Sequence, residues 1–102
     1  MKITKSMFYN PSPEARELFL CADNNGLAYP QICAVVSNLA RKYKKGIFNA
    51  EQATVAFFHI MTAEAKRYAR DFGYMFSVTE RWTAAADMLT DQMDNIKNQA
   101  TA

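Results

Sequence analysis

The residue types that most often carry out catalysis or bind metals are few in this chain. His59 is the only histidine, and Cys21 and Cys33 are the only cysteines. One histidine without a carboxylate three residues further on does not make a metal site, and two cysteines outside a CxxC pattern match no zinc motif. A nucleophilic cysteine needs a lowered thiol pKa, and no sequence neighbour of either cysteine provides one. We therefore expect no enzymatic activity, no metal and no cofactor.

Four acidic residues are spaced so that they fall on one face of a helix near the end of the chain. A single helix offers too few converging oxygens to hold a divalent cation. Two interpretations stay open: the face is solvated and keeps the protein in solution, or it binds a basic surface of a partner. The candidate partner-binding residues, called the acidic row below, are Glu80, Asp87, Asp91 and Asp94.

A dense group of cations precedes Gly46, where a helix is expected to end. At such a position positive charge offsets the helix dipole, which stabilises the helix by about 0.3–1 kcal/mol per residue. The alternative is that these side chains bind the phosphates of a nucleic acid. This group, called the basic end below, is Arg41, Lys42, Lys44 and Lys45.

A second basic group near the end of the next expected helix consists of Lys66, Arg67 and Arg70. If consecutive helices are antiparallel, it lies at the opposite end of the molecule from the basic end. The two groups then form no continuous footprint on duplex DNA. A helix-turn-helix is also disfavoured, because the expected second helix carries its cations at its C-terminal end and not at its N-terminal end.

Turn and capping residues divide the chain into four expected helices. Ser12 is an N-cap residue followed by Pro13, and Ser77 with Glu80 matches a capping box. Asn49 with Gln52 has the same form. Gly26 is suited to a left-handed C-terminal cap. The expected helices run from Pro13 to the turn Asn24-Asn25-Gly26, from Pro30 to Lys44 or Lys45, from Ala50 to about Phe72, and from Val78 to about Asn98.

Apolar residues recur at steps of three and four along these segments, which is the period of an amphipathic helix. The expected fold is all-α: one domain over 1–102, a compact four-helix bundle with short connections. Residues 1–11 are expected to form an extended arm and 99–102 a frayed tail. The expected core is Leu18, Phe19, Ile32, Val36, Leu39, Phe57, Met61, Tyr68, Phe72, Trp82, Leu89 and Met93.

The composition is that of an ordinary globular domain. Half of the 102 residues are hydrophobic, 22% are charged, and the net charge is +2, which argues against a histone-like polyanion binder. The first ten residues lack the apolar stretch of a signal peptide, and no apolar run approaches the ~20 residues of a membrane span. We expect a cytoplasmic protein with no membrane partner; self-association is a further option.

The segment Ser12–Leu18, the Asn38-Leu39 pair, the Lys44-Lys45-Gly46 stop and the segment 72–76 resemble small uncharacterised proteins of bacteriophages and prophages. The resemblance covers about 10–80 and transfers no functional residue. It implies a viral protein that binds a host macromolecule, in its sharper form an inhibitor of a host defence complex. The alternative expectation is a small nucleic-acid-binding accessory protein that uses the basic end.

Overall fold

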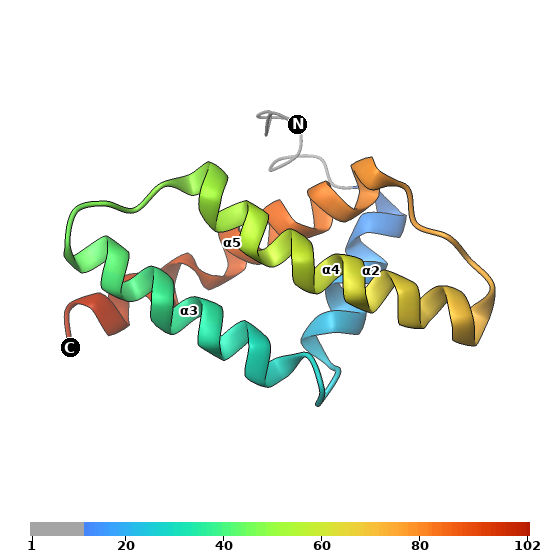
Figure 1. The fold of residues 1–102 in the computed structure, drawn as a ribbon, viewed down its shortest axis with the longest axis horizontal. Coiled ribbons are helices and arrows are strands. Elements are labelled where there is room, and N and C mark those ends of the chain that lie inside the picture. The colour runs from blue at the N-terminus through green and yellow to red at the C-terminus, as the bar shows by residue number, and fades with distance from the viewer. Residues whose placement is uncertain (1–11) are drawn as a thin grey trace.

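The computed structural model describes residues 12–102, and these form four helices connected by five-residue segments. No strand occurs within that range, so the expected all-α four-helix bundle is confirmed. The expected arm at 1–11 lies outside the described residues. The helices in Figure 1 are α2 (Pro13–Asp23), α3 (Tyr29–Lys44), α4 (Ala50–Phe72) and α5 (Val78–Ala100).

Helix α5 is the centre of the fold because it packs against α2, α3 and α4. Three consecutive alanines in its middle, Ala84, Ala85 and Ala86, are all 0% exposed. Successive residues of a helix point about 100° apart, so a single neighbouring helix cannot cover all three. Their small side chains let the surrounding helices approach α5 closely from several sides.

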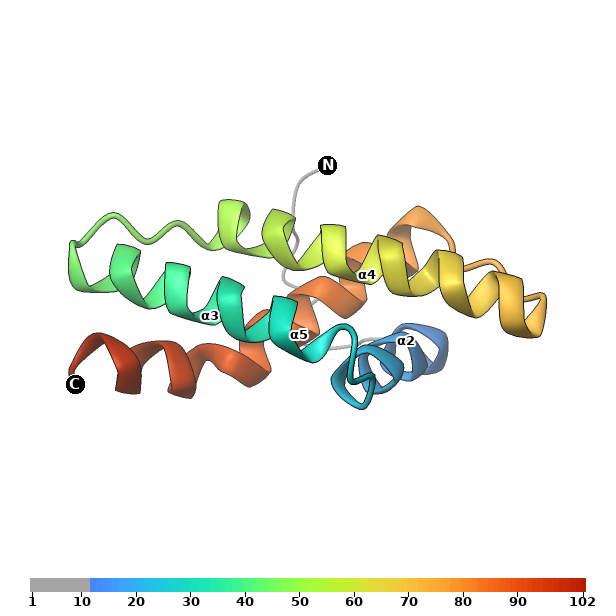
Figure 2. The same ribbon diagram turned by 60° about the horizontal axis from the view of Figure 1, so that its bottom comes forward.

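Helices α3 and α5 run in the same direction and end on the same side of the molecule, while α4 runs back the other way (Figures 1 and 2). Helix α2 is short and crosses the others near the far end of α4. The described chain is an elongated body of 42 × 29 × 17 Å. The C-terminal ends of α3 and α4 are therefore far apart.

The helix starts follow the local sequence closely. The Ser12 hydroxyl accepts the Ala15 N–H at 3.1 Å, and the Asn49 side chain accepts the Gln52 N–H at 3.0 Å. Ser77 and Glu80 form a complete capping box, with reciprocal bonds of 3.0 and 2.7 Å. Within residues 12–102 the return bond expected from the Gln52 side chain to Asn49 is absent.

Two of the three glycines adopt a left-handed conformation after a helix, although that conformation was expected only for Gly26. Gly46 has φ +74° and Gly73 has φ +76°. The prediction for Gly26 is wrong, because its φ is not positive. Helix α2 ends instead at Asn24, whose N–H donates to Leu20 and Ala22, and the Asn25 side chain accepts the Leu27 N–H at 3.0 Å to close the turn.

Most of the expected core is buried, with one clear error. Leu18, Phe57 and Met61 are fully buried, whereas Phe72 is 73% exposed. Phe72 is the last residue of α4, in a turn that projects past α2 and α5, so no neighbouring helix covers it (Figure 1). The other residues of the expected core are buried (Phe19, Ile32, Val36, Leu39, Leu89) or half-buried (Tyr68, Trp82, Met93).

The last helix is longer than expected. It continues to Ala100, two residues past the expected end at Asn98. Ala100 is buried, and the Ser37 hydroxyl of α3 donates to the Gln99 side chain at 3.4 Å. Residues 99 and 100 are therefore held against α3 and are not part of a frayed tail.

Candidate functional site

The acidic row is not a uniform solvated face. The Asp87 carboxylate accepts a hydrogen bond from the Arg16 guanidinium of α2 at 2.6 Å and is only 14% exposed. The same guanidinium lies 4.7 Å above the ring of Phe19. Asp87 thus joins α5 to α2, and its charge is already balanced within the molecule.

Glu80 is also engaged inside the protein. Its carboxylate accepts the Ser77 N–H of its own capping box and the Tyr74 hydroxyl at 3.0 Å. Asp91 has a raised pKa, because partial burial disfavours its charge and because Asp23 and Asp87 are nearby. Asp91 and Asp94 are both exposed, and neither takes part in a hydrogen bond or an ion pair in the part of the chain that the structure describes. The partner-binding role of the row stays a prediction.

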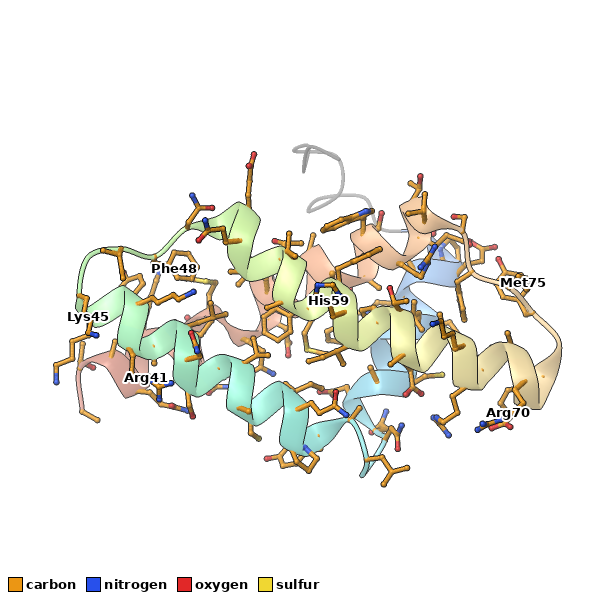
Figure 3. The ribbon with its side chains drawn as sticks, viewed as in Figure 1. Arg41, Lys45, Phe48, His59, Arg70 and Met75 are labelled. Atoms are coloured by element: carbon orange, nitrogen blue, oxygen red, sulfur yellow. The ribbon has the colours of Figure 1, made fainter. Side chains whose placement is uncertain are left out.

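The basic end is more accessible. Arg41, Lys44 and Lys45 are exposed and Lys42 is half-buried. None of these four takes part in an ion pair among residues 12–102. Figure 3 places Arg41 and Lys45 at one end of the molecule and Arg70 at the other, which confirms that the two basic groups make no single patch.

The second basic group contains an ion pair that the sequence did not reveal. Glu64 of α4 is 3% exposed, and its carboxylate is paired with the Arg67 guanidinium. The Asn25 side chain donates to the second carboxylate oxygen at 2.7 Å. Hydrogen bonding to Glu64 raises the pKa of Arg67. Arg67 therefore neutralises a buried acid, and the bond from Asn25 to that acid links the α2–α3 connection to α4. The burial of Glu64 could have been predicted from its helical spacing from Phe57 and Ile60, which places it on the core face of α4.

The cysteines and the histidine form no reactive centre. Burial and the nearby Glu17 carboxylate raise the pKa of the Cys21 thiol, which lowers its thiolate fraction. Cys33 is exposed on α3, and His59 is exposed on α4 beside Phe58. Across residues 12–102 no three His, Cys, Asp or Glu side chains are grouped to hold a metal ion.

Exposed apolar side chains occur at several places on the surface, including Leu27, Tyr29 and Ile47, and four of them fall within seven residues where α4 ends and α5 begins. Phe72 is 73% exposed and Met75 is 82% exposed, and Tyr74 and Val78 are also exposed. We call these four residues the apolar tip. Figure 3 shows Met75 and Arg70 at the same end of the molecule, on opposite sides of the last turns of α4, and the Arg70 side chain is 74% exposed. Sequence analysis did not predict this site, because the helical period of the apolar residues placed Phe72 in the core.

The apolar tip rests on a fixed aromatic base. Phe76 is buried, and its ring centroid lies 4.8 Å from that of Tyr74 and 5.1 Å from that of Tyr68. The Tyr68 and Phe72 rings are 4.7 Å apart. With the bond from the Tyr74 hydroxyl to Glu80, these contacts restrain the Phe72 and Tyr74 rings of the tip.

None of the helices of residues 12–102 combines the length and the hydropathy that crossing a membrane requires. Comparisons with protein-family models, with curated proteins and with solved structures gave no match to this chain.

Proposed function

We propose that this chain is a non-enzymatic binding protein that occupies a surface of another protein through its apolar tip. The observation that carries the proposal is the high exposure of both Phe72, the last residue of α4, and Met75, in the five-residue connection that follows it. Contiguous exposed apolar groups on a small domain commonly mark an interaction surface. Exposed Phe and Met at these positions add nothing to the core that α5 organises.

The composition of the tip supports a protein partner. Aromatic residues, Met and Arg are enriched in the centres of protein interfaces, whereas Lys and acids are depleted there. The tip provides Phe72, Tyr74 and Met75, and Arg70, whose guanidinium is paired with Asp71, lies at the same end of the molecule. Because Tyr74 is already held by Phe76 and Glu80, less side-chain entropy is lost on binding.

The resemblance to phage proteins supports a host macromolecule as the partner, in the host cytoplasm, with inhibition of a defence complex as the sharper form. The acidic row was the first candidate for the contact. Asp87 and Glu80 are already engaged within the chain, so we assign the main contact to the tip and keep Asp91 and Asp94 as a secondary one.

Site-specific photocrosslinking in a bacterial lysate tests this proposal. A benzophenone side chain at 72 or 75 should capture one dominant protein, and the same group at Leu20 or Val55, which are also exposed apolar positions, should not. Replacing Phe72 and Met75 together with Ser should abolish the capture. Equal capture from all four positions would contradict the proposal, as would a crosslink only between copies of this chain.

Nucleic-acid binding through the basic end is the second candidate. It is favoured by four cations with no ion pair among the described residues. A labelled DNA or RNA should then shift at about 50 mM salt and be released steeply as salt rises. Charge removal at Lys44 and Lys45 should weaken the shift, and the tip variant should not. Absence of any shift at low salt excludes this candidate.

A further inference from the structure

A groove between α3 and α4 lies away from the apolar tip and near the basic end. Its volume is about 370 Å³, which is within the range of small-ligand sites. Its apolar wall is formed by Val35 and Leu39 of α3 and Ala56 of α4. Leu39 is buried, while Val35 and Ala56 are partly exposed. The groove therefore offers an apolar surface that the helix packing leaves uncovered.

Three polar side chains border the same groove. Lys42 and Asn38 come from α3, and Gln52 comes from the first turn of α4. Lys42 is the only charged residue of the lining, and no carboxylate in the lining offsets it. It is also the one half-buried member of the basic end, and it has no ion pair within residues 12–102.

The Asn38 and Gln52 amides can donate hydrogen bonds toward an anion at Lys42. The Asn38 and Gln52 side chains take part in no hydrogen bond among residues 12–102, so both amides are available to a ligand. The positive end of the α4 dipole lies at this first turn, where Glu51 already meets part of it. One ammonium and two amide donors match the two oxygens of a carboxylate.

We propose that the α3–α4 groove binds a free monocarboxylate with a short alkyl chain. The carboxylate lies against the Lys42 ammonium and accepts from the Asn38 and Gln52 amides. The alkyl chain covers Val35 and Leu39. An alkylammonium ion is excluded by Lys42, and an alcohol of the same length keeps the apolar contact but loses the charge-assisted bond. This ligand site does not depend on the proposed function of the tip.

Methyl and amide NMR titrations with hexanoate, 1-hexanol and hexylammonium test the site. Hexanoate should shift the Val35 and Leu39 methyl signals and saturate, and it should bind about tenfold more tightly than hexanol because it gains a charge-assisted bond. Hexylammonium should leave these signals in place. Equal shifts with hexylammonium, or hexanoate shifts that miss Val35 and Leu39, would overturn the assignment.

Two lysine variants separate the groove from the general positive charge. Lys42→Met keeps the chain length and should reduce hexanoate affinity to that of hexanol. Lys44→Met removes the same charge from an exposed site outside the groove and should leave hexanoate affinity within twofold. Equal losses of hexanoate affinity in both variants would show that the ligand responds only to the general positive charge of this region and not to Lys42 in the groove. Tighter binding of a leucine-terminated peptide carboxylate by more than tenfold would refute a free acid as the ligand.

Discussion

Arg16 of α2 and Asp87 of α5 form an ion pair of 2.6 Å between residues that are 71 positions apart in the chain. Helix α2 has only 11 residues, so it depends on such contacts more than the longer helices do. The pair also explains why Asp87 is poorly placed to meet a partner.

Removing this pair should loosen α2. We expect Asp87→Asn to lower the free energy of unfolding by about 1 kcal/mol, because Arg16 is half-exposed and solvent screens the pair. Urea denaturation followed by circular dichroism measures the loss, which should shrink at 1 M salt. Asp94→Asn, a matched change on the same helix at an exposed position, should be neutral. A neutral Asp87→Asn would show that apolar contacts alone hold α2.

Substitution of Glu64, the buried acid of α4, should lower the free energy of unfolding more than substitution of Asp87 does. Glu64→Ala leaves the Asn25 amide and the Arg67 guanidinium without their acceptor and should cost about 1–3 kcal/mol, since water can reach the freed guanidinium. Thermal unfolding of this variant should be compared with that of Glu64→Leu combined with Arg67→Met. The double variant should recover most of the loss, since no charge is then left uncompensated. Loss of the fold in both variants would show that the ion pair specifies the α2–α3 connection.

Asp91 should make the protein less stable as pH rises. Its pKa is raised in the folded state by burial and by Asp23 and Asp87, so the folded protein binds the proton more tightly than the unfolded chain does. The favourable contribution is complete below the ordinary pKa of 3.8 and is lost as pH rises through the folded pKa. Asp91→Asn should therefore raise the melting temperature at pH 7 and leave it unchanged at pH 3. A lower melting temperature at pH 7 would contradict this.

The apolar tip should be neutral for stability. Replacing Phe72 and Met75 with Ser should change the free energy of unfolding by no more than about 0.5 kcal/mol, because both side chains are exposed. Phe57→Ala, in contrast, should cost about 3–5 kcal/mol, because Phe57 is fully buried. Urea denaturation of both variants tests the contrast. A large loss in the tip variant would mean that the tip contributes to folding.

The two cysteines should differ in reactivity. Iodoacetamide should modify Cys33 first, because it is exposed, whereas the Cys21 thiol is half-buried and has a raised pKa. Mass spectrometry of Cys21→Ser and Cys33→Ser variants over time gives the two rates separately. Faster modification of Cys21 would point to opening of the α2 end of the fold.

The sequence predicts those structural features that depend only on residues close together in the chain. The Ser77–Glu80 capping box and the end of α3 just before Gly46 involve only a few consecutive residues, so their local patterns were sufficient to predict them. Phe72 had the correct helical period, but its burial depends on whether another helix extends as far as the end of α4. How far the neighbouring helices extend depends on tertiary packing, so the helical period of α4 cannot predict it.

The candidate site was less predictable for the same reason. The spacing of the acidic residues along α5 placed Asp87 on the outer face of that helix. Only the fold shows that Arg16 of α2 covers it. The apolar tip follows from a projecting helix end, which no local pattern encodes. The basic end was located correctly from sequence, because it depends only on where α3 ends.

The buried alanines of α5 have a consequence for the order of events during synthesis. Every other described helix packs on α5, yet α5 is the last of the four to be made. When the ribosome has not yet reached Val78, the chain contains α2, α3 and α4 but lacks α5, the helix on which all three pack. The apolar faces that these helices turn toward α5 remain open to proteases and chaperones until α5 has been made. The chain must therefore reach its native packing largely in one late step.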